Sequence, residues 1–149
     1  MYHFVKTGKP IFLVPGNHDW HATDFLAARY KAYNLHGKSI RHGSIALLGC
    51  GGSNIGMTEK EIYETIKETN KRAQNPTKKI LITHVHPAGT IMESFSQFVK
   101  GSTGVRKAIE SIKPDIVLCG HVHEAEGIEE KIGQTTIINV GKKGKLIEL

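Results

Sequence analysis

The chain has 149 residues, a formal net charge of +6 and 39% hydrophobic residues, which suits one globular domain with a core of its own. No stretch approaches the ~18 consecutive apolar residues that a membrane-spanning helix needs, and the first residues lack the pattern of a signal peptide. We therefore expect a cytoplasmic protein with no membrane partner. Cys50 and Cys119 both have apolar neighbours, so we expect two buried free thiols and no disulfide.

Strand and helix patterns alternate along the first part of the chain. The apolar run at residues 10–14 predicts a buried strand. Apolar residues at helical spacing predict a helix over residues 23–33. Residues 39–42 and 45–48 form the predicted arms of a hairpin, because a glycine-led pair of residues between them suits a tight turn.

The helix that follows has a clear start and end. Thr58 can cap it, and Glu61 completes a capping box three residues later. Glu68 and Arg72 can pair one turn apart, and the Asn-Pro pair at residues 75–76 ends the helix. Two of its residues should point inward: Ile62 and Ile66.

The second part of the chain continues the alternation. A long loop with a partly apolar lining is predicted over residues 87–100, and a helix with one apolar stripe over residues 105–112. Such alternation predicts an α/β fold in which helices cover sheets. The predicted strands lie at residues 79–83, 116–119, 128–131, 135–140 and 145–149.

Three short histidine motifs follow three of the predicted strands. A rigid strand that ends in a loop holds polar side chains at a fixed place. Neutral imidazole is the commonest metal ligand in proteins, and an asparagine oxygen can join it, so converging loops would form a metal site. Taken singly, the Gly-Asn pair of the first motif could simply form a turn, and His-x-His is a weak signal of metal binding. In the second motif either histidine could bind. The motifs are Gly16-Asn17-His18-Asp19, Thr83-His84-Val85-His86 and Gly120-His121-Val122-His123.

In order and spacing, these motifs resemble the third, fourth and fifth motifs of the calcineurin-like metallophosphoesterase superfamily, with its small prokaryotic phosphodiesterase-like branch the most similar. Residues 133–141 resemble the segment after the fifth motif. The resemblance implies a four-layer α/β/β/α sandwich as one domain over residues 1–149. The family's first two motifs, Asp-x-His after a first strand and Gly-Asp-x-x-Asp, do not occur in this order here, which implies an N-terminally truncated, incomplete domain.

The resemblance also implies roles for individual residues. The residues that match Asn17, His84 and His121 bind one metal in relatives, and the residue that matches His123 binds a second. The residue that matches His18 protonates the leaving oxygen or steadies the phosphate, and Asp19 stands beside it as a second catalytic candidate. The candidate substrate-binding residues are Gly51, Gly52, Asn54 and His86, together with the loop at 87–100.

The implied cofactor is a divalent transition metal. Nitrogen and oxygen ligands without a thiolate suit Mn, Fe, Zn, Co or Ni. Two such ions activate a bridging hydroxide and neutralise charge on the phosphoryl group. Because the aspartates of the first two motifs are not in this sequence, we expect at most one weakly bound metal and little activity from this chain alone.

The expected function is a metal-dependent phosphoesterase, with phosphodiesters preferred to monoesters as the substrate. Two alternatives stay open: a non-catalytic interaction module with the same fold, and a nuclease, which the positive charge would suit. Relatives place the strands that are absent here inside one of two stacked sheets. Their absence would leave free strand edges, so we also expect a homo-oligomer.

Overall fold

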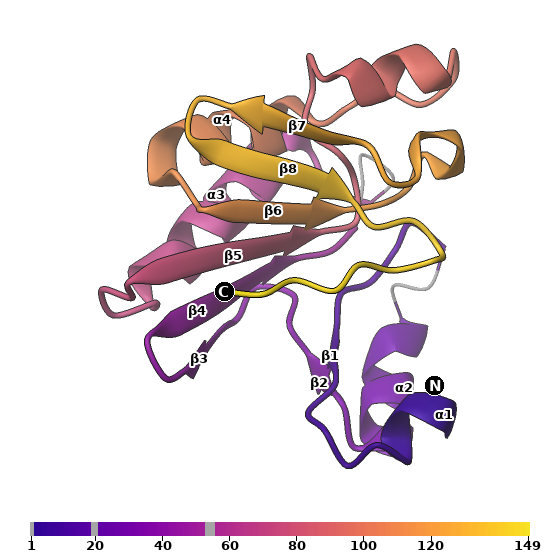
Figure 1. Ribbon diagram of the computed structural model, residues 1–149, viewed down its shortest axis with the longest axis vertical. Helices are drawn as coiled ribbons and strands as arrows, with labels where there is room; N and C mark the ends of the chain where they lie inside the picture. Colours follow the sequence, from indigo (N-terminus) through magenta and orange to yellow (C-terminus); the bar gives the residue numbers. More distant parts are fainter. Residues whose placement is uncertain (1, 19–20, 53–55) are drawn as a thin grey trace.

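A mixed six-stranded sheet lies at the centre of the computed structural model, which describes residues 2–18, 21–52 and 56–149 (Figure 1). Its strands are β3 (Ser39–His42), β4 (Ile45–Cys50), β5 (Lys78–Thr83), β6 (Ile116–Cys119), β7 (Glu129–Ile132) and β8 (Thr135–Asn139). The order across the sheet is β3-β4-β5-β6-β8-β7. The four inner strands are parallel, and the two edge strands pair antiparallel with their neighbours. The predicted α/β class and the predicted hairpin of β3 and β4 are confirmed.

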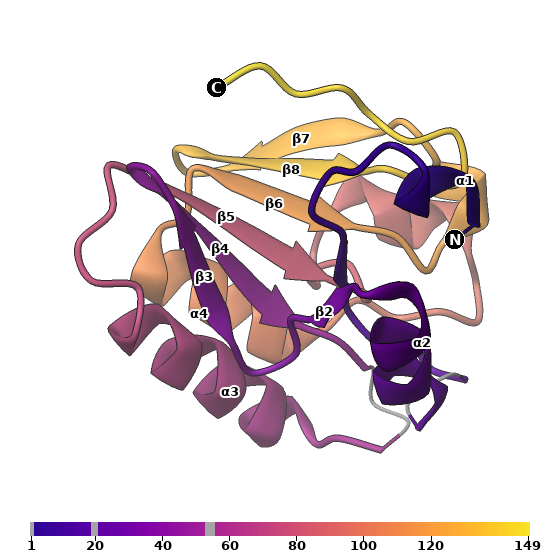
Figure 2. The same cartoon turned by 90° about the horizontal axis from the view of Figure 1, so that it is seen from below.

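Two amphipathic helices, α3 (Glu59–Lys71) and α4 (Thr103–Ile112), lie side by side on one face of the sheet (Figure 2). Their apolar stripes pack against the residues of the parallel strands that point toward them, and this packing forms the core. Removing apolar surface from water is the main stabilising contribution to such a core. The core includes Leu48, Leu81, Val117 and Ile137 from the strands and Ile62, Ile66, Val105 and Ile109 from the helices. The two cysteines are buried and free, as predicted.

The start of α3 matches its prediction. The hydroxyl of Thr58 accepts from the N–H of Glu61, and the Glu61 carboxylate accepts from the N–H of Thr58. The ion pair predicted between Glu68 and Arg72 is wrong. Glu68 pairs with Lys71, whereas Arg72 is the C-cap residue and donates to the carbonyl of Gly37.

The N-terminal part forms a small unit at one end of the six-stranded sheet (Figure 1). The helix predicted over residues 23–33 ends at Tyr30, because Lys31 takes the left-handed conformation with φ of 52°. Tyr33 then pairs with Phe12 in a parallel two-stranded sheet, so the strand predicted at residues 10–14 is shorter than expected. The elements of this unit are α1 (Tyr2–Val5), β1 (Phe12–Leu13), α2 (Ala22–Tyr30) and β2 (Tyr33–Asn34).

The sheet face opposite α3 and α4 is apolar and incompletely covered. The strand register places Leu47 beside Ile80, and Ile82 beside Leu118, on this face. Residues 145–149 run extended over the face of the sheet and not along its edge (Figure 2). The strand predicted there is therefore wrong: in the described part of the chain this segment joins no ladder, and Leu146 is 85% exposed.

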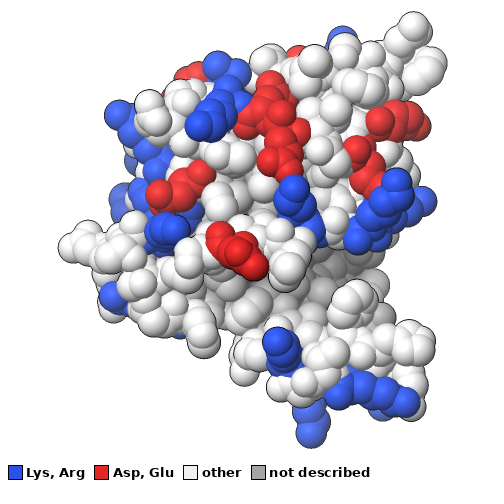
Figure 3. All heavy atoms as spheres, in the orientation of Figure 1, with Lys and Arg blue, Asp and Glu red and all other residues white. Residues whose placement is uncertain are grey.

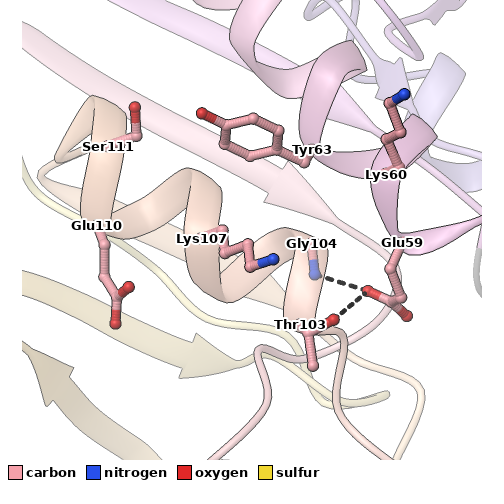
Figure 4. A pocket seen from close by; sticks show the side chains of 8 residues that line it. All are labelled: Glu59, Lys60, Tyr63, Thr103, Gly104, Lys107, Glu110 and Ser111. Atoms are coloured by element: carbon pink, nitrogen blue, oxygen red, sulfur yellow. Dashed lines mark hydrogen bonds between the residues drawn. The ribbon is translucent and has the colours of Figure 1, made fainter.

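Glu59 connects the two helices of the covered face. One of its carboxylate oxygens accepts from the N–H of Gly104 at 2.6 Å and from the hydroxyl of Thr103 at 3.3 Å (Figure 4). The same oxygen accepts from the hydroxyl of Ser102 at 2.6 Å. A negative charge at a helix N-terminus is favourable. A Cβ on Gly104 would lie 2.2 Å from the backbone oxygen of Glu59, so the close approach of the helices requires glycine. Together these contacts fix α4 against α3 and form one end of a groove of about 560 Å³.

We predict that Glu59→Ala lowers the free energy of unfolding by about 2 kcal/mol, because it leaves the N–H of Gly104 in the first turn of α4 without its acceptor. Urea denaturation measures the loss. Glu64→Ala is the matched control, since Glu64 makes only an exposed pair with Lys67 and such pairs contribute about 0–1 kcal/mol. Equal losses in the two variants would show that Glu59 does not hold the helices together.

Candidate metal centre

The three histidine motifs meet at one end of the sheet. β5 and β6 are parallel neighbours, so the loops that follow them start side by side, which is the usual place for ligands in open α/β sheets. His84 directly follows β5, and His121 comes two residues after β6. Asn17 arrives from the loop after β1 and completes the group.

The three side chains converge closely. Nε2 of His84 lies 2.9 Å from Oδ1 of Asn17 and 2.9 Å from Nδ1 of His121. The two imidazole rings meet edge to face, with centroids 4.7 Å apart. A ring nitrogen either donates or accepts, so Nε2 of His84 cannot donate to Asn17 while it accepts from His121. A single cation would satisfy the lone pairs of all three atoms at once.

The spacing and the donor types both fit a divalent metal ion. Adjacent ligands about 2.1 Å from an octahedral ion are roughly 3.0 Å apart, which agrees with the two separations of 2.9 Å. Imidazole nitrogen and amide oxygen suit borderline divalent cations. In the described part of the chain, no group of three or more His, Cys, Asp or Glu side chains could hold a metal. The set is therefore two imidazoles and one amide.

His18 and His123 lie next to this set without joining its contacts. Burial lowers the pKa of His121, and the proximity of His123 and His18 lowers it further. His121 consequently keeps a neutral ring and an available lone pair at neutral pH. His123 is exposed at the start of η2 (His123–Ala125), and His18 is exposed as well. The other catalytic candidate, Asp19, lies outside the described residues.

His121 has an unusual backbone conformation. Its φ is +71°, and the N–H of Val122 donates to the carbonyl of Gly120 at 2.9 Å. A hydrogen bond across three residues with positive φ in the middle defines a strained type of γ-turn. Such a conformation costs about 1–3 kcal/mol in a residue with a side chain. The N–H of Gly120 also donates to the carbonyl of His84 at 3.0 Å, which ties the two histidine loops together.

The glycines predicted to contact substrate support the Asn17 loop. The N–H of Gly52 donates to the carbonyl of Pro15 at 2.7 Å, and a Cβ on Gly51 would lie 2.3 Å from Cδ of Pro15. The N–H of Gly51 donates to Nδ1 of His36 at 3.2 Å. Both glycines are buried in this structure. Their predicted contact with a substrate remains a prediction, and Asn54 lies outside the described residues.

The side chain of His86 is fully buried. Neither ring nitrogen has a hydrogen-bond partner among the described residues. Burial lowers its pKa, an effect that the charge of Glu93 partly opposes. A substrate would reach this ring only if the surrounding residues moved, so the substrate contact predicted for His86 has no support in the geometry.

The loop predicted at residues 87–100 contains a short helix, η1 (Ile91–Phe95). Its apolar residues divide between core and surface: Met92 is buried, whereas Phe98 is 95% exposed. Glu93 joins the two ends of the loop, because its two carboxylate oxygens accept from the N–H groups of Gly89 and Gly101. The loop is therefore an ordered projection beside η2.

Comparison with known proteins places the chain in a family. The family described as "Metallophosphoesterase, calcineurin superfamily" matches residues 3–145, and this chain belongs to it. A UPF0046 protein of Caenorhabditis elegans is 35% identical over 82 residues, which are 55% of this chain and 27% of the relative. The match thus spans about a quarter of the relative's length. No solved structure matches. In the described part of the chain, no helix is long and apolar enough to cross a membrane.

We predict that His121→Gly is more stable than His121→Ala by about 1 kcal/mol, because glycine adopts positive φ without strain. Chemical denaturation of both variants measures the difference. His123, which has an ordinary helical backbone, provides the control: there the glycine variant should be the less stable of the pair. The same order at both positions would contradict a strained turn at His121.

Proposed function

We propose that this chain is a metal-dependent phosphoesterase domain that acts on phosphodiesters in preference to monoesters. Its family supports phosphoester chemistry. The observation that carries the proposal is the convergence of Asn17, His84 and His121 on one point, with two separations of 2.9 Å. A module that only bound another protein would gain nothing from three lone-pair donors gathered at a loop edge.

In the proposed function, Oδ1 of Asn17, Nε2 of His84 and Nδ1 of His121 hold a divalent metal ion. When bound, the ion would act as a Lewis acid and lower the pKa of water. The protein's own residues have separate tasks. His18, next to Asn17 in the sequence and close enough to affect the charge of His121, donates a proton to the leaving oxygen. The exposed His123 would contribute one ligand to a second ion. Because one ligand is too few to hold an ion, we expect this chain to bind one metal.

The distribution of charge favours a small phosphodiester over a nucleic acid. On the face of the six-stranded sheet that Figure 3 shows, the Lys and Arg side chains are interleaved with Asp and Glu. Proteins that follow a nucleic-acid backbone present a basic patch or stripe on one face. The net charge of +6 is therefore weak support for the nuclease alternative.

We predict that the protein binds Mn²⁺ and that Asn17→Ala and His84→Ala each weaken binding at least tenfold, since each removes one of three ligands. Isothermal titration calorimetry measures the affinity, and hydrolysis of bis-p-nitrophenyl phosphate with Mn²⁺ measures turnover. His42→Ala, an exposed histidine on the edge strand β3, is the control and should bind as the unaltered chain does. Binding that all three variants retain would exclude this ligand set. Because the aspartates of the first two motifs are not in this sequence, we expect turnover to be slow even when Mn²⁺ binds.

We also propose that two copies of the chain associate through the apolar sheet face and its free edge. Leu47, Ile82 and Leu118 are only half-buried there, and β3 has an unpaired side, which favours pairing between chains. We predict a dimer in light scattering, and a shift to monomer in Ile116→Lys, whose residue shares this face. Ser111→Lys adds the same charge on the exposed side of α4 and should leave the dimer intact. A monomeric parent chain would refute the association.

A further inference from the structure

We infer that Asn139 is the positioning residue of the candidate metal centre: its side-chain amide holds the loop that carries His121 and His123. This role rests on the proposed metal-dependent function. Asn139 is the last residue of β8 and has no solvent exposure. Its Nδ2 donates to the carbonyl of Val122 at 2.8 Å. Val122 is the residue between the two candidate ligands, so this bond acts on the loop at its centre.

The strained turn at His121 needs support on both sides. On its N-terminal side, the N–H of Gly120 donates to the carbonyl of His84. On its C-terminal side, Val122 receives the hydrogen bond from Asn139. A residue persists in a sparsely populated backbone conformation only when its surroundings over-determine it. Asn139 supplies the second of the two fixed points and thereby sets the direction of the His121 ring.

The amide of Asn139 is itself held in one orientation. Its Oδ1 accepts from the N–H of Gly141 at 3.0 Å, whereas Nδ2 faces the Val122 carbonyl. Turning the amide over would set donor against donor and acceptor against acceptor. The register of β8 places Asn139 directly beside Cys119, the residue before Gly120. The rigid strand β8 therefore places the Asn139 amide within hydrogen-bond distance of the loop.

No other common side chain of this size can replace the amide. A carboxylate lacks the donor, and an apolar group leaves the carbonyl of the buried Val122 with the longer hydrogen bond of 3.3 Å from the N–H of Ala125. Either change removes the shorter bond on the C-terminal side of the turn, and the strain at His121 then favours a relaxed backbone. The imidazoles of His121 and His123 move with it. Loss of a residue that orients a metal ligand typically costs 10- to 100-fold in metal affinity.

A matched pair of variants separates positioning from simple stability. Asn139→Leu removes the bond to Val122, and Asn139→Ala is the smaller second variant in case the first folds poorly. Thr135→Val removes a comparable bond at the other end of β8, where the buried Thr135 hydroxyl donates to the carbonyl of Pro114 at 2.6 Å. All three variants should lose stability in urea. Only the Asn139 variants should bind Mn²⁺ about tenfold or more weakly by calorimetry.

Hydrogen exchange of the metal-free protein supplies a readout that does not depend on binding. The Val122 amide closes the turn at His121, so it should exchange faster in the Asn139 variants than in Thr135→Val. Equal Mn²⁺ affinity and equal Val122 exchange in the two sets would overturn the role of Asn139. If the parent chain itself fails to bind Mn²⁺, the proposed function falls, and the Val122 exchange rates alone decide whether Asn139 holds the loop.

Discussion

The parallel pairing of β5 with β6 determines where the candidate metal centre lies. Ile82 and Leu118 are opposite each other in this ladder, so the two strands end beside each other. His84 and His121, which follow these strands, therefore lie close together. The hydrogen bond from Gly120 to the carbonyl of His84 continues the pairing beyond the strands. A slip of one residue would turn the faces of a strand over and would separate the two rings. The core beneath α3 and α4 prevents that slip and so fixes the ligand geometry.

Hydrogen bonds from neighbouring elements stabilise the strained backbone of His121. His121 needs a left-handed backbone to present Nδ1 to His84, and a glycine there would relieve the strain at the cost of the ligand. The surrounding strands make that conformation the best available. The loop after β5 contributes the His84 carbonyl, and β8 contributes the Asn139 amide. The position of the His121 ring therefore depends on hydrogen bonds from residues outside its own loop, because these bonds set the direction of that loop.

Features that depend on neighbouring residues in the sequence could be predicted. The capping box at Thr58 and the apolar stripe of α4 were of this kind, and so were the inner strands. Features that depend on tertiary contacts could not. Residues 145–149 were predicted as a strand, yet in the described part of the chain the segment lies over the sheet face and joins no ladder. The three motifs predicted a site, but no pattern signals the positive φ of His121, and the role of Asn139 follows from a register that only the folded sheet defines.

The three ligands of the proposed site are not held equally well. His84 and His121 follow strands of the six-stranded sheet, whereas Asn17 follows β1, which is two residues long and, among the described strands, pairs with β2 alone. The Asn17 loop is joined to the large sheet through Pro15, whose carbonyl accepts from Gly52. Gly51 permits that approach because any Cβ would overlap Pro15. The two imidazoles thus form the rigid part of the site. The position of the amide oxygen, and with it the affinity for a metal ion, depends on this contact between two loops.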